Sequence, residues 1–198
     1  MPPRSDKPDK PDPTKVKMQT LFSAEQIAER NRQIGKEIAA QHERDLLVIP
    51  VLKGSFIFAA DLIRELHLNG LSPQVDFLYL SSYHDGTVSS GKVDILRDIE
   101  TDVTGRDVLL LDDILESGRT LQFALELLEK RGAASVKICV FLDKEVLRAE
   151  HIELQADYFG FKCPDLFVVG YGMDLAQRFR ELPFVGHIIT EETAPEKE

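Results

Sequence analysis

The chain has 198 residues, of which 43% are hydrophobic and 29% charged, and its formal net charge is −10 at pH 7. This length and composition are typical of one globular domain, which buries roughly 70% of the surface of its unfolded chain. The acidic balance argues against a protein whose main task is to bind nucleic acid, because such proteins present a basic face to the phosphates.

Both ends of the chain have the composition of disordered tails. Residues 1–17 hold five prolines among alternating lysines and aspartates, and residues 191–198 are equally polar. We therefore predict an N-terminal tail over 1–17, one domain over 18–190 and a flexible C-terminal tail over 191–198. The apolar runs are too short for a membrane span and the first residues lack the apolar core of a signal peptide, so a cytoplasmic location is expected.

Strands and helices alternate along the predicted domain. Ser23, followed three residues later by Gln26, is a capping box that opens a helix to about Gln41. Apolar periodicity and turn signals place the other elements. Strands are predicted at residues 46–52, 75–82, 93–97, 107–111, 136–142, 157–161, 167–169 and 185–190, helices at 56–67 and 121–130, and a loop rich in Gly, Ser and Thr at 83–91.

This alternation predicts an α/β fold, with a mostly parallel sheet flanked by helices on both faces. Right-handed crossovers bring the strand ends and the turns after them to one edge of the sheet. The turn at Lys53, the segment at Asp112 and the turn at Lys144 should therefore meet there. Cys139 and Cys163 are expected to be buried free thiols, and the five histidines lack the spacing of a zinc site.

Residues 108–120 read VLLLDDILESGRT, which is an apolar strand, two aspartates and an acidic turn with one glycine before a helix. Backbone N–H groups at the start of a helix bind phosphate. Neighbouring carboxylates would repel phosphate alone, so a ligand that also carries a sugar diol or a divalent cation fits better. The Walker and dinucleotide-binding glycine patterns are absent, and a pair of solvated turn acids is the simpler alternative.

The same string resembles the diphosphoribose-binding signature of the phosphoribosyltransferases. Four further segments resemble bacterial hypoxanthine–guanine members of that family: VLKGSF, SSYHDG, FLDKE and FVVGYGMDLAQRFR. The resemblance implies a type I phosphoribosyltransferase fold with a small hood region. It also implies a purine-salvage enzyme that transfers ribose 5-phosphate from phosphoribosyl pyrophosphate to hypoxanthine or guanine, giving IMP or GMP plus pyrophosphate, with Mg²⁺ as cofactor.

The resemblance further implies which residues contact the ligands. Asp112 and Asp113 would bind the ribose hydroxyls, and the backbone at Lys53 and Gly54, near which the family often has a cis peptide, would bind pyrophosphate together with Arg180. Substrate contacts are implied for Lys53, Gly54, Ser82, Tyr83, Asp112, Asp113, Ile114, Leu115, Glu116, Ser117, Gly118, Arg119, Thr120, Lys144, Leu166, Phe167, Val168, Asp174 and Arg180, and metal contacts for Asp112, Asp113 and Asp174.

Glu116 aligns with the family's proposed acceptor of the purine N7 proton, where the usual residue is Asp. Because Glu is one methylene longer, Glu116 is either that base or only a part of the phosphate site. Lys144 would donate to the purine O6, since an ammonium has only donors and disfavours the amino group of adenine, and a surface lysine is the alternative. Phe167 would stack on the base and the Val168 backbone would read its edge, although both also fit a core strand.

Residues 82–91, beginning with Ser82 and Tyr83, would close over the site and exclude water, the alternative being a plain hairpin loop. The alternative interpretation of Arg180 is a charged residue on the surface of a helix. The relatives usually form homodimers or homotetramers, so a homo-oligomer is expected, without a nucleic-acid or membrane partner. A xanthine-preferring enzyme and a related RNA-binding regulator are the alternative functions, and the acidic composition speaks against the second.

Overall fold

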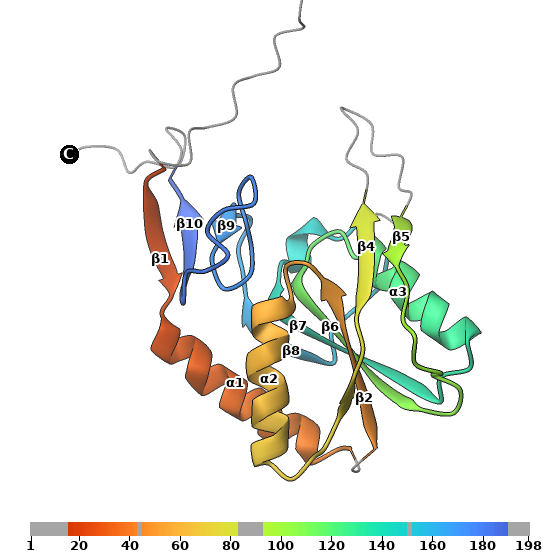
Figure 1. Cartoon of the computed structure of the whole chain (residues 1–198). Helices are drawn as coiled ribbons and strands as arrows, with labels where there is room; N and C mark the ends of the chain where they lie inside the picture. Colours follow the sequence, from red (N-terminus) through yellow and green to blue (C-terminus); the bar gives the residue numbers. More distant parts are fainter. Residues whose placement is uncertain (1–15, 43–44, 83–92, 150–151, 190–198) are drawn as a thin grey trace, which may run out of the picture.

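The computed structural model of the chain describes residues 16–42, 45–82, 93–149 and 152–189 (Figure 1). Its main sheet has seven strands in the order β5-β4-β2-β6-β7-β8, with β3 also paired to β2. All its pairings are parallel except that of β4 with β5. The strands are β2 (Leu46–Leu52), β3 (Gln74–Val75), β4 (Leu78–Ser82), β5 (Val93–Arg97), β6 (Asp107–Leu115), β7 (Ser135–Asp143) and β8 (Tyr158–Lys162).

Helices cover both faces of this sheet, as the alternating pattern predicts. The helices α1 (Ala24–Ala39) and α2 (Phe56–Leu68) pack on one face, and α3 (Arg119–Lys130) packs on the other. Each buried Leu, Ile or Phe side chain contributes roughly 1.5–3 kcal/mol, so the two layers supply most of the stabilisation. The helical core residues include Ile34, Ile38, Phe58, Leu62 and Leu66 on the first face and Leu121, Ala124 and Leu128 on the second.

The capping box at the start of α1 is confirmed. Ser23 Oγ accepts from the backbone N–H of Gln26 at 3.3 Å, and the Gln26 side chain accepts from the backbone N–H of Ser23 at 2.8 Å. These bonds satisfy two donors that would otherwise be unpaired near the helix start. The helix then buries Ile34 and Ile38 against the sheet, at the predicted spacing.

A second sheet of three antiparallel strands forms the small region implied by the resemblance. Its strands are β1 (Met18–Phe22), β10 (Val185–Ile188) and β9 (Val168–Val169), with β10 in the middle. Figure 1 shows this sheet at the end of the molecule toward which β2 and β4 point. It therefore stands at the carboxyl end of the parallel strands, where the predicted site residues lie.

The strand predicted over residues 75–82 is wrong in one respect, because it is divided into β3 and β4. Asp76 causes the break: its carboxylate accepts from the backbone N–H groups of Phe77, Glu100 and Thr101, at 2.7, 2.8 and 2.8 Å. A side chain that bonds backbone donors in this way competes with the strand ladder. Both parts still pair with β2, and β4 also pairs with β5.

Two boundaries near the aspartates also differ from prediction. The strand β6 continues beyond Leu111 to Leu115, since its pairing with β7 extends to Leu115 opposite Asp143. The helix α3 begins at Arg119 rather than Leu121. The strand β1 and the short 3-10 helix η1 (Glu145–Leu147) were not predicted.

The two thiols are buried and free, as predicted, and burial raises the pKa of the Cys139 thiol. Residues 83–91, with Tyr83 among them, and most of both predicted tails lie outside the described residues. In the part of the chain that the structure describes, no helix is both long and apolar enough to cross a membrane.

Candidate active site

The ends of β2 and β6 and the 170–182 segment meet at one edge of the sheet. A Cβ added to Gly54 would lie 1.6 Å from Oδ2 of Asp113, and one added to Gly172 would lie 2.1 Å from the carbonyl oxygen of Gly54. Gly172 also has φ 100, which L side chains rarely adopt. Gly172 therefore cannot be replaced without moving backbone, and a side chain at Gly54 would displace the Asp113 carboxylate. The peptide between Leu52 and Lys53 is cis, close to the position that the resemblance implied.

Asp112 and Asp113 lie inside β6 and are not solvated turn acids. Asp112 is 8% exposed, and its Oδ1 accepts from the backbone N–H of Asp113 at 2.9 Å. Burial raises the pKa of Asp112 well above its ordinary value, and the adjacent Asp113 charge raises it further. Burial also raises the pKa of Asp113, while the charge of Arg180 acts in the opposite direction. A bound diol or cation would compensate this buried acidity.

Residues 116–120, which we call the 116–120 loop, present backbone N–H groups at the start of α3. Gly118 is the N-cap residue of the helix and has φ 81, a conformation that suits glycine. Among the described residues, nothing accepts a hydrogen bond from the backbone N–H groups of Glu116, Ser117 and Gly118. Available donors at a helix N-terminus are suited to phosphate. Arg119 and Thr120 form the first residues of the helix.

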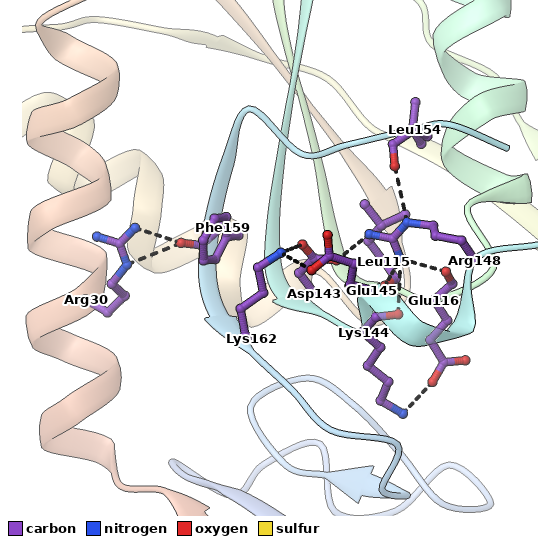
Figure 2. Close-up of polar contacts among 10 residues, drawn as sticks. All are labelled: Arg30, Leu115, Glu116, Asp143, Lys144, Glu145, Arg148, Leu154, Phe159 and Lys162. Atoms are coloured by element: carbon purple, nitrogen blue, oxygen red, sulfur yellow. Dashed lines mark hydrogen bonds and ion pairs between the residues drawn. The ribbon is translucent and has the colours of Figure 1, made fainter.

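Lys144 is a buried residue of the site and not the surface lysine that was the alternative. Its side chain is 4% exposed, and Nζ lies 2.5 Å from Oε1 of Glu116 and 2.8 Å from the carbonyl oxygen of Leu166. An ammonium has three N–H donors, so one remains for a ligand. The Glu116 side chain is 48% exposed. The pair, drawn in Figure 2, can therefore offer a donor and an acceptor side by side.

Asp174 and Arg180 form a second polar group, on the 170–182 segment. Arg180 Nη2 lies 2.6 Å from Asp174 Oδ1, and Nη1 donates to the carbonyl oxygen of Gly172 at 2.6 Å. Asp174 Oδ2 accepts from the backbone N–H of Gln177 at 2.7 Å. Arg180 lies in no helix and its side chain is 19% exposed, so it is not a helix surface charge.

The residues predicted to contact a planar ligand differ in exposure. Phe167 is 55% exposed, so its ring is not a core side chain, whereas Val168 is 5% exposed and pairs with His187 in the small sheet. Ser82 is the last residue of β4, and its side chain lies outside the described part of the chain, as does the whole of Tyr83. The prediction for these two residues remains a prediction.

Sequence reasoning missed two polar groups beside the site. The Tyr171 hydroxyl donates to Asp61 Oδ2 at 2.8 Å and accepts from Asn31 Nδ2 at 2.6 Å, which ties the 170–182 segment to α1 and α2. Arg148 donates to backbone carbonyl oxygens at the start of the 116–120 loop. Tyr171 stood in a predicted motif between two glycines, but Arg148 had no signal beyond its place shortly after Lys144.

The carboxylates at this site are suitable ligands for Mg²⁺, although they do not form a complete coordination shell by themselves. Within residues 16–42, 45–82, 93–149 and 152–189, no group of three or more His, Cys, Asp or Glu side chains could hold a metal ion. Mg²⁺ is commonly held by one or two carboxylates together with water and ligand phosphates. The carboxylates of the buried Asp112 and the partly buried Asp113, whose negative charge a cation would compensate, meet this need, with Asp174 on the 170–182 segment.

Comparisons with known proteins agree with this arrangement. The Phosphoribosyl transferase domain family matches residues 21–176. The hypoxanthine-guanine phosphoribosyltransferase of Bacillus subtilis is 44% identical over 167 residues, which cover 84% of this chain and 90% of that protein. The bifunctional protein TilS/HprT of Listeria monocytogenes is also 44% identical over 167 residues, which are 84% of this chain but only 25% of its own length.

The fold comparison leads to the same family. A crystal structure of a hypoxanthine-guanine phosphoribosyltransferase from Bacillus anthracis has a TM-score of 0.81 and 40% identity, over 88% of this chain and 99% of that chain. The type I phosphoribosyltransferase fold implied by the sequence is therefore confirmed. The chain belongs to the phosphoribosyltransferase family, and within it to the hypoxanthine-guanine phosphoribosyltransferases.

Proposed function

We propose that the chain is a purine-salvage enzyme that transfers the ribose 5-phosphate of phosphoribosyl pyrophosphate to a 6-oxopurine. Hypoxanthine and guanine are the bases, and IMP or GMP and pyrophosphate are the products. The names of the relatives at 44% identity support this activity.

The contact between Lys144 and Glu116 carries the proposal. A 6-oxopurine presents O6 and N7 next to each other on one edge of the base. Lys144 has an unused N–H donor for O6, and the Glu116 carboxylate beside it can accept the N7 proton as the base is ribosylated. Adenine offers an amino group where O6 would be, so it would face Lys144 with a donor. The geometry therefore favours a 6-oxopurine.

The other predicted contacts assign each part of phosphoribosyl pyrophosphate to a part of the site. The 116–120 loop would receive the 5-phosphate, and Asp112 and Asp113 would accept from the ribose hydroxyls. The backbone at Lys53 and Gly54 and the guanidinium of Arg180 would contact pyrophosphate. The remaining predicted contacts lie at or near the base and involve Ile114, Leu115, Leu166, Phe167 and Val168. Ser82 and Tyr83 belong to the segment that would exclude water.

Asp112, Asp113 and Asp174 would hold Mg²⁺, partly through water. A bound Mg²⁺ would stabilise the negative charge that develops on pyrophosphate as it leaves. The protein side chains do the rest, because they orient the ribose, hold the base and accept its proton. A homodimer or homotetramer, a cytoplasmic location and the division into two tails and one domain remain predictions alongside this activity.

A substrate panel tests the proposal. Purified protein with Mg²⁺ and phosphoribosyl pyrophosphate is given hypoxanthine, guanine, xanthine, adenine or uracil, and nucleotide and pyrophosphate are measured. We expect product from hypoxanthine and guanine and none from adenine or uracil. Xanthine as the best substrate would select the xanthine-preferring alternative. If no base gives a nucleotide, the proposed activity is wrong.

A further inference from the structure

Arg148 binds the backbone behind the 116–120 loop (Figure 2). Its Nη1 donates to the carbonyl oxygens of Leu115 and Glu116, both at 2.7 Å, and its Nε donates to that of Leu154 at 3.2 Å. Its Nη2 forms an ion pair with Oδ1 of Asp143, the last residue of β7. A guanidinium suits this position because it carries N–H donors on several sides in one rigid plane.

The carbonyl groups of three consecutive residues are directed at the segment that contains Arg148. Leu115 also accepts from the backbone N–H of Lys144 at 3.0 Å, and Ser117 accepts from the backbone N–H of Ala149 at 3.0 Å. Together with the bonds from Arg148 to Leu115 and Glu116, every carbonyl group from residue 115 to residue 117 is bonded. These bonds hold one side of the loop against the segment that follows β7.

This arrangement determines where the opposite side of the loop faces. In a planar trans peptide, the carbonyl of one residue and the N–H of the next point in opposite directions. Carbonyls 115–117 point toward the Arg148 segment, so the N–H groups of Glu116, Ser117 and Gly118 point away from it. These are the N–H groups without an acceptor among the described residues. They are also the donors proposed to receive the 5-phosphate.

Burial keeps Arg148 in this orientation. The side chains of Arg148 and Asp143 are 14% and 5% exposed, and Lys162 lies 2.7 Å from the second oxygen of Asp143. The stem of Arg148 also passes close to Gly118, where an added Cβ would lie 3.8 Å from Arg148 Cδ. The guanidinium therefore has little freedom to release the carbonyls.

We propose that Arg148 is a positioning residue for the 5-phosphate: it holds the carbonyls of Leu115 and Glu116 so that the N–H groups of the 116–120 loop face the ligand. The inference rests on the proposed function, because it concerns the same phosphate. Arg148 itself does not reach the ligand in this arrangement. Its contribution is the orientation of donors before the ligand binds, which lowers the cost of binding.

The test uses Arg148→Lys with two matched controls. The lysine keeps the charge beside Asp143, but its three N–H donors all start from one nitrogen, so they cannot reproduce the contacts that Arg148 makes from Nε, Nη1 and Nη2. Arg30→Lys is the first control, because Arg30 also donates to two backbone carbonyls, those of Phe159 and Gly160, which lie away from the loop. Lys162→Ala is the second control, because it removes the other partner of Asp143 and touches no loop carbonyl.

The quantity measured is the ratio of the affinities for GMP and guanosine, obtained by titration calorimetry at a temperature where thermal unfolding shows every variant to be folded. This ratio isolates the contribution of the 5-phosphate to binding. A general loss of stability would leave the ratio unchanged. We expect Arg148→Lys to lower the ratio roughly tenfold or more, as for loss of charge-assisted hydrogen bonds at a preorganised site. Both controls should stay within about twofold of the wild-type ratio.

A ratio in Arg148→Lys that equals the wild-type ratio would overturn the inference, and so would an equal fall in the Arg30→Lys control. Should Arg148→Lys fail to fold, Asp143→Asn replaces it, since this change weakens the hold on Nη2 and should lower the same ratio to a smaller extent. An unchanged ratio in Asp143→Asn would then reject the inference. The proposed function is judged separately, because it fails if the wild-type protein makes no nucleotide in the substrate panel.

Discussion

The ammonium of Lys144 lies 2.5 Å from the carboxylate of Glu116, although 28 residues separate them in the chain. The contact joins the segment after β7 to the 116–120 loop, and so it joins the part proposed to recognise the base to the part proposed to bind phosphate. The two side chains would act on adjacent atoms of the purine but in different ways. Substituting each of them separately should therefore change different kinetic constants.

Replacing Glu116 by Gln should lower turnover more than binding. Gln has nearly the same size and still accepts a hydrogen bond from Lys144, but it cannot take up a proton. We expect kcat to fall by roughly 10²- to 10⁴-fold, the usual contribution of a general base, with little change in the dissociation constant of phosphoribosyl pyrophosphate. Steady-state kinetics and equilibrium titration measure these two quantities.

Glu145→Gln is the matched control for that substitution. Glu145 is a nearby, 70% exposed carboxylate that pairs with Lys162, and it has no proposed contact with the ligand. Its kcat should stay close to the wild-type value. A loss of binding in Glu116→Gln as large as the loss of kcat would instead make Glu116 a part of the phosphate site, the alternative that its sequence position left open.

Replacing Lys144 by Met should weaken recognition of the base. Met has a similar length and suits a buried position, but it offers no donor to O6. We expect KM for hypoxanthine to rise by roughly 10- to 100-fold, since a site that bonds a polar group discriminates by that interaction. KM for phosphoribosyl pyrophosphate should change much less. The opposite pattern in steady-state kinetics would place Lys144 at the pyrophosphate.

Much of the fold could be predicted because apolar periodicity reports burial. The predicted bounds of the strand Leu46–Leu52 match β2, and the capping box of α1 is present as the sequence indicated. The extension of β6 could not be predicted, because Asp112 and Asp113 favour turns when read alone. Their strand conformation comes from pairing with β7, a partner distant in the sequence.

Some residues of the site could be predicted and others could not, for a similar physical reason. Residues such as Lys144 and Asp113 stand in motifs, and the strand order brings those motifs to one edge of the sheet. Arg148 acts on backbone carbonyls, which every residue possesses, so no sequence pattern marks its acceptors. The exposure of Phe167 against the burial of Val168 also depends on how the small sheet pairs, which local sequence does not determine.

Replacing Tyr171 by Phe should destabilise the protein. The change removes the hydroxyl that bonds Asp61 and Asn31, and Asn31 is 2% exposed, so its amide would lose a buried partner. The free energy of unfolding should fall by about 1–3 kcal/mol, measured by urea denaturation. Tyr158→Phe is the control, because that hydroxyl bonds Gln41, which is exposed, and its loss should cost less. Equal costs would contradict this explanation.

Replacing Gly54 by Ala should weaken binding of phosphoribosyl pyrophosphate. A Cβ at this position would lie 1.6 Å from Oδ2 and 2.4 Å from Cγ of Asp113, so either the Asp113 carboxylate or the Gly54 backbone must move. Displacements of about 1 Å in a preorganised site can cost roughly 10²-fold, and we expect a loss of binding of that order in an equilibrium titration.

Gly186→Ala is the matched control, because its Cβ would meet only Met18 Sδ at 3.3 Å, Phe184 Cε2 at 3.4 Å and the Gln19 carbonyl oxygen at 3.5 Å. Since the first two atoms belong to side chains that can shift, the affinity should be retained. If Gly54→Ala bound as tightly as this control while remaining folded, Asp113 and the Gly54 backbone could not both belong to the ligand site.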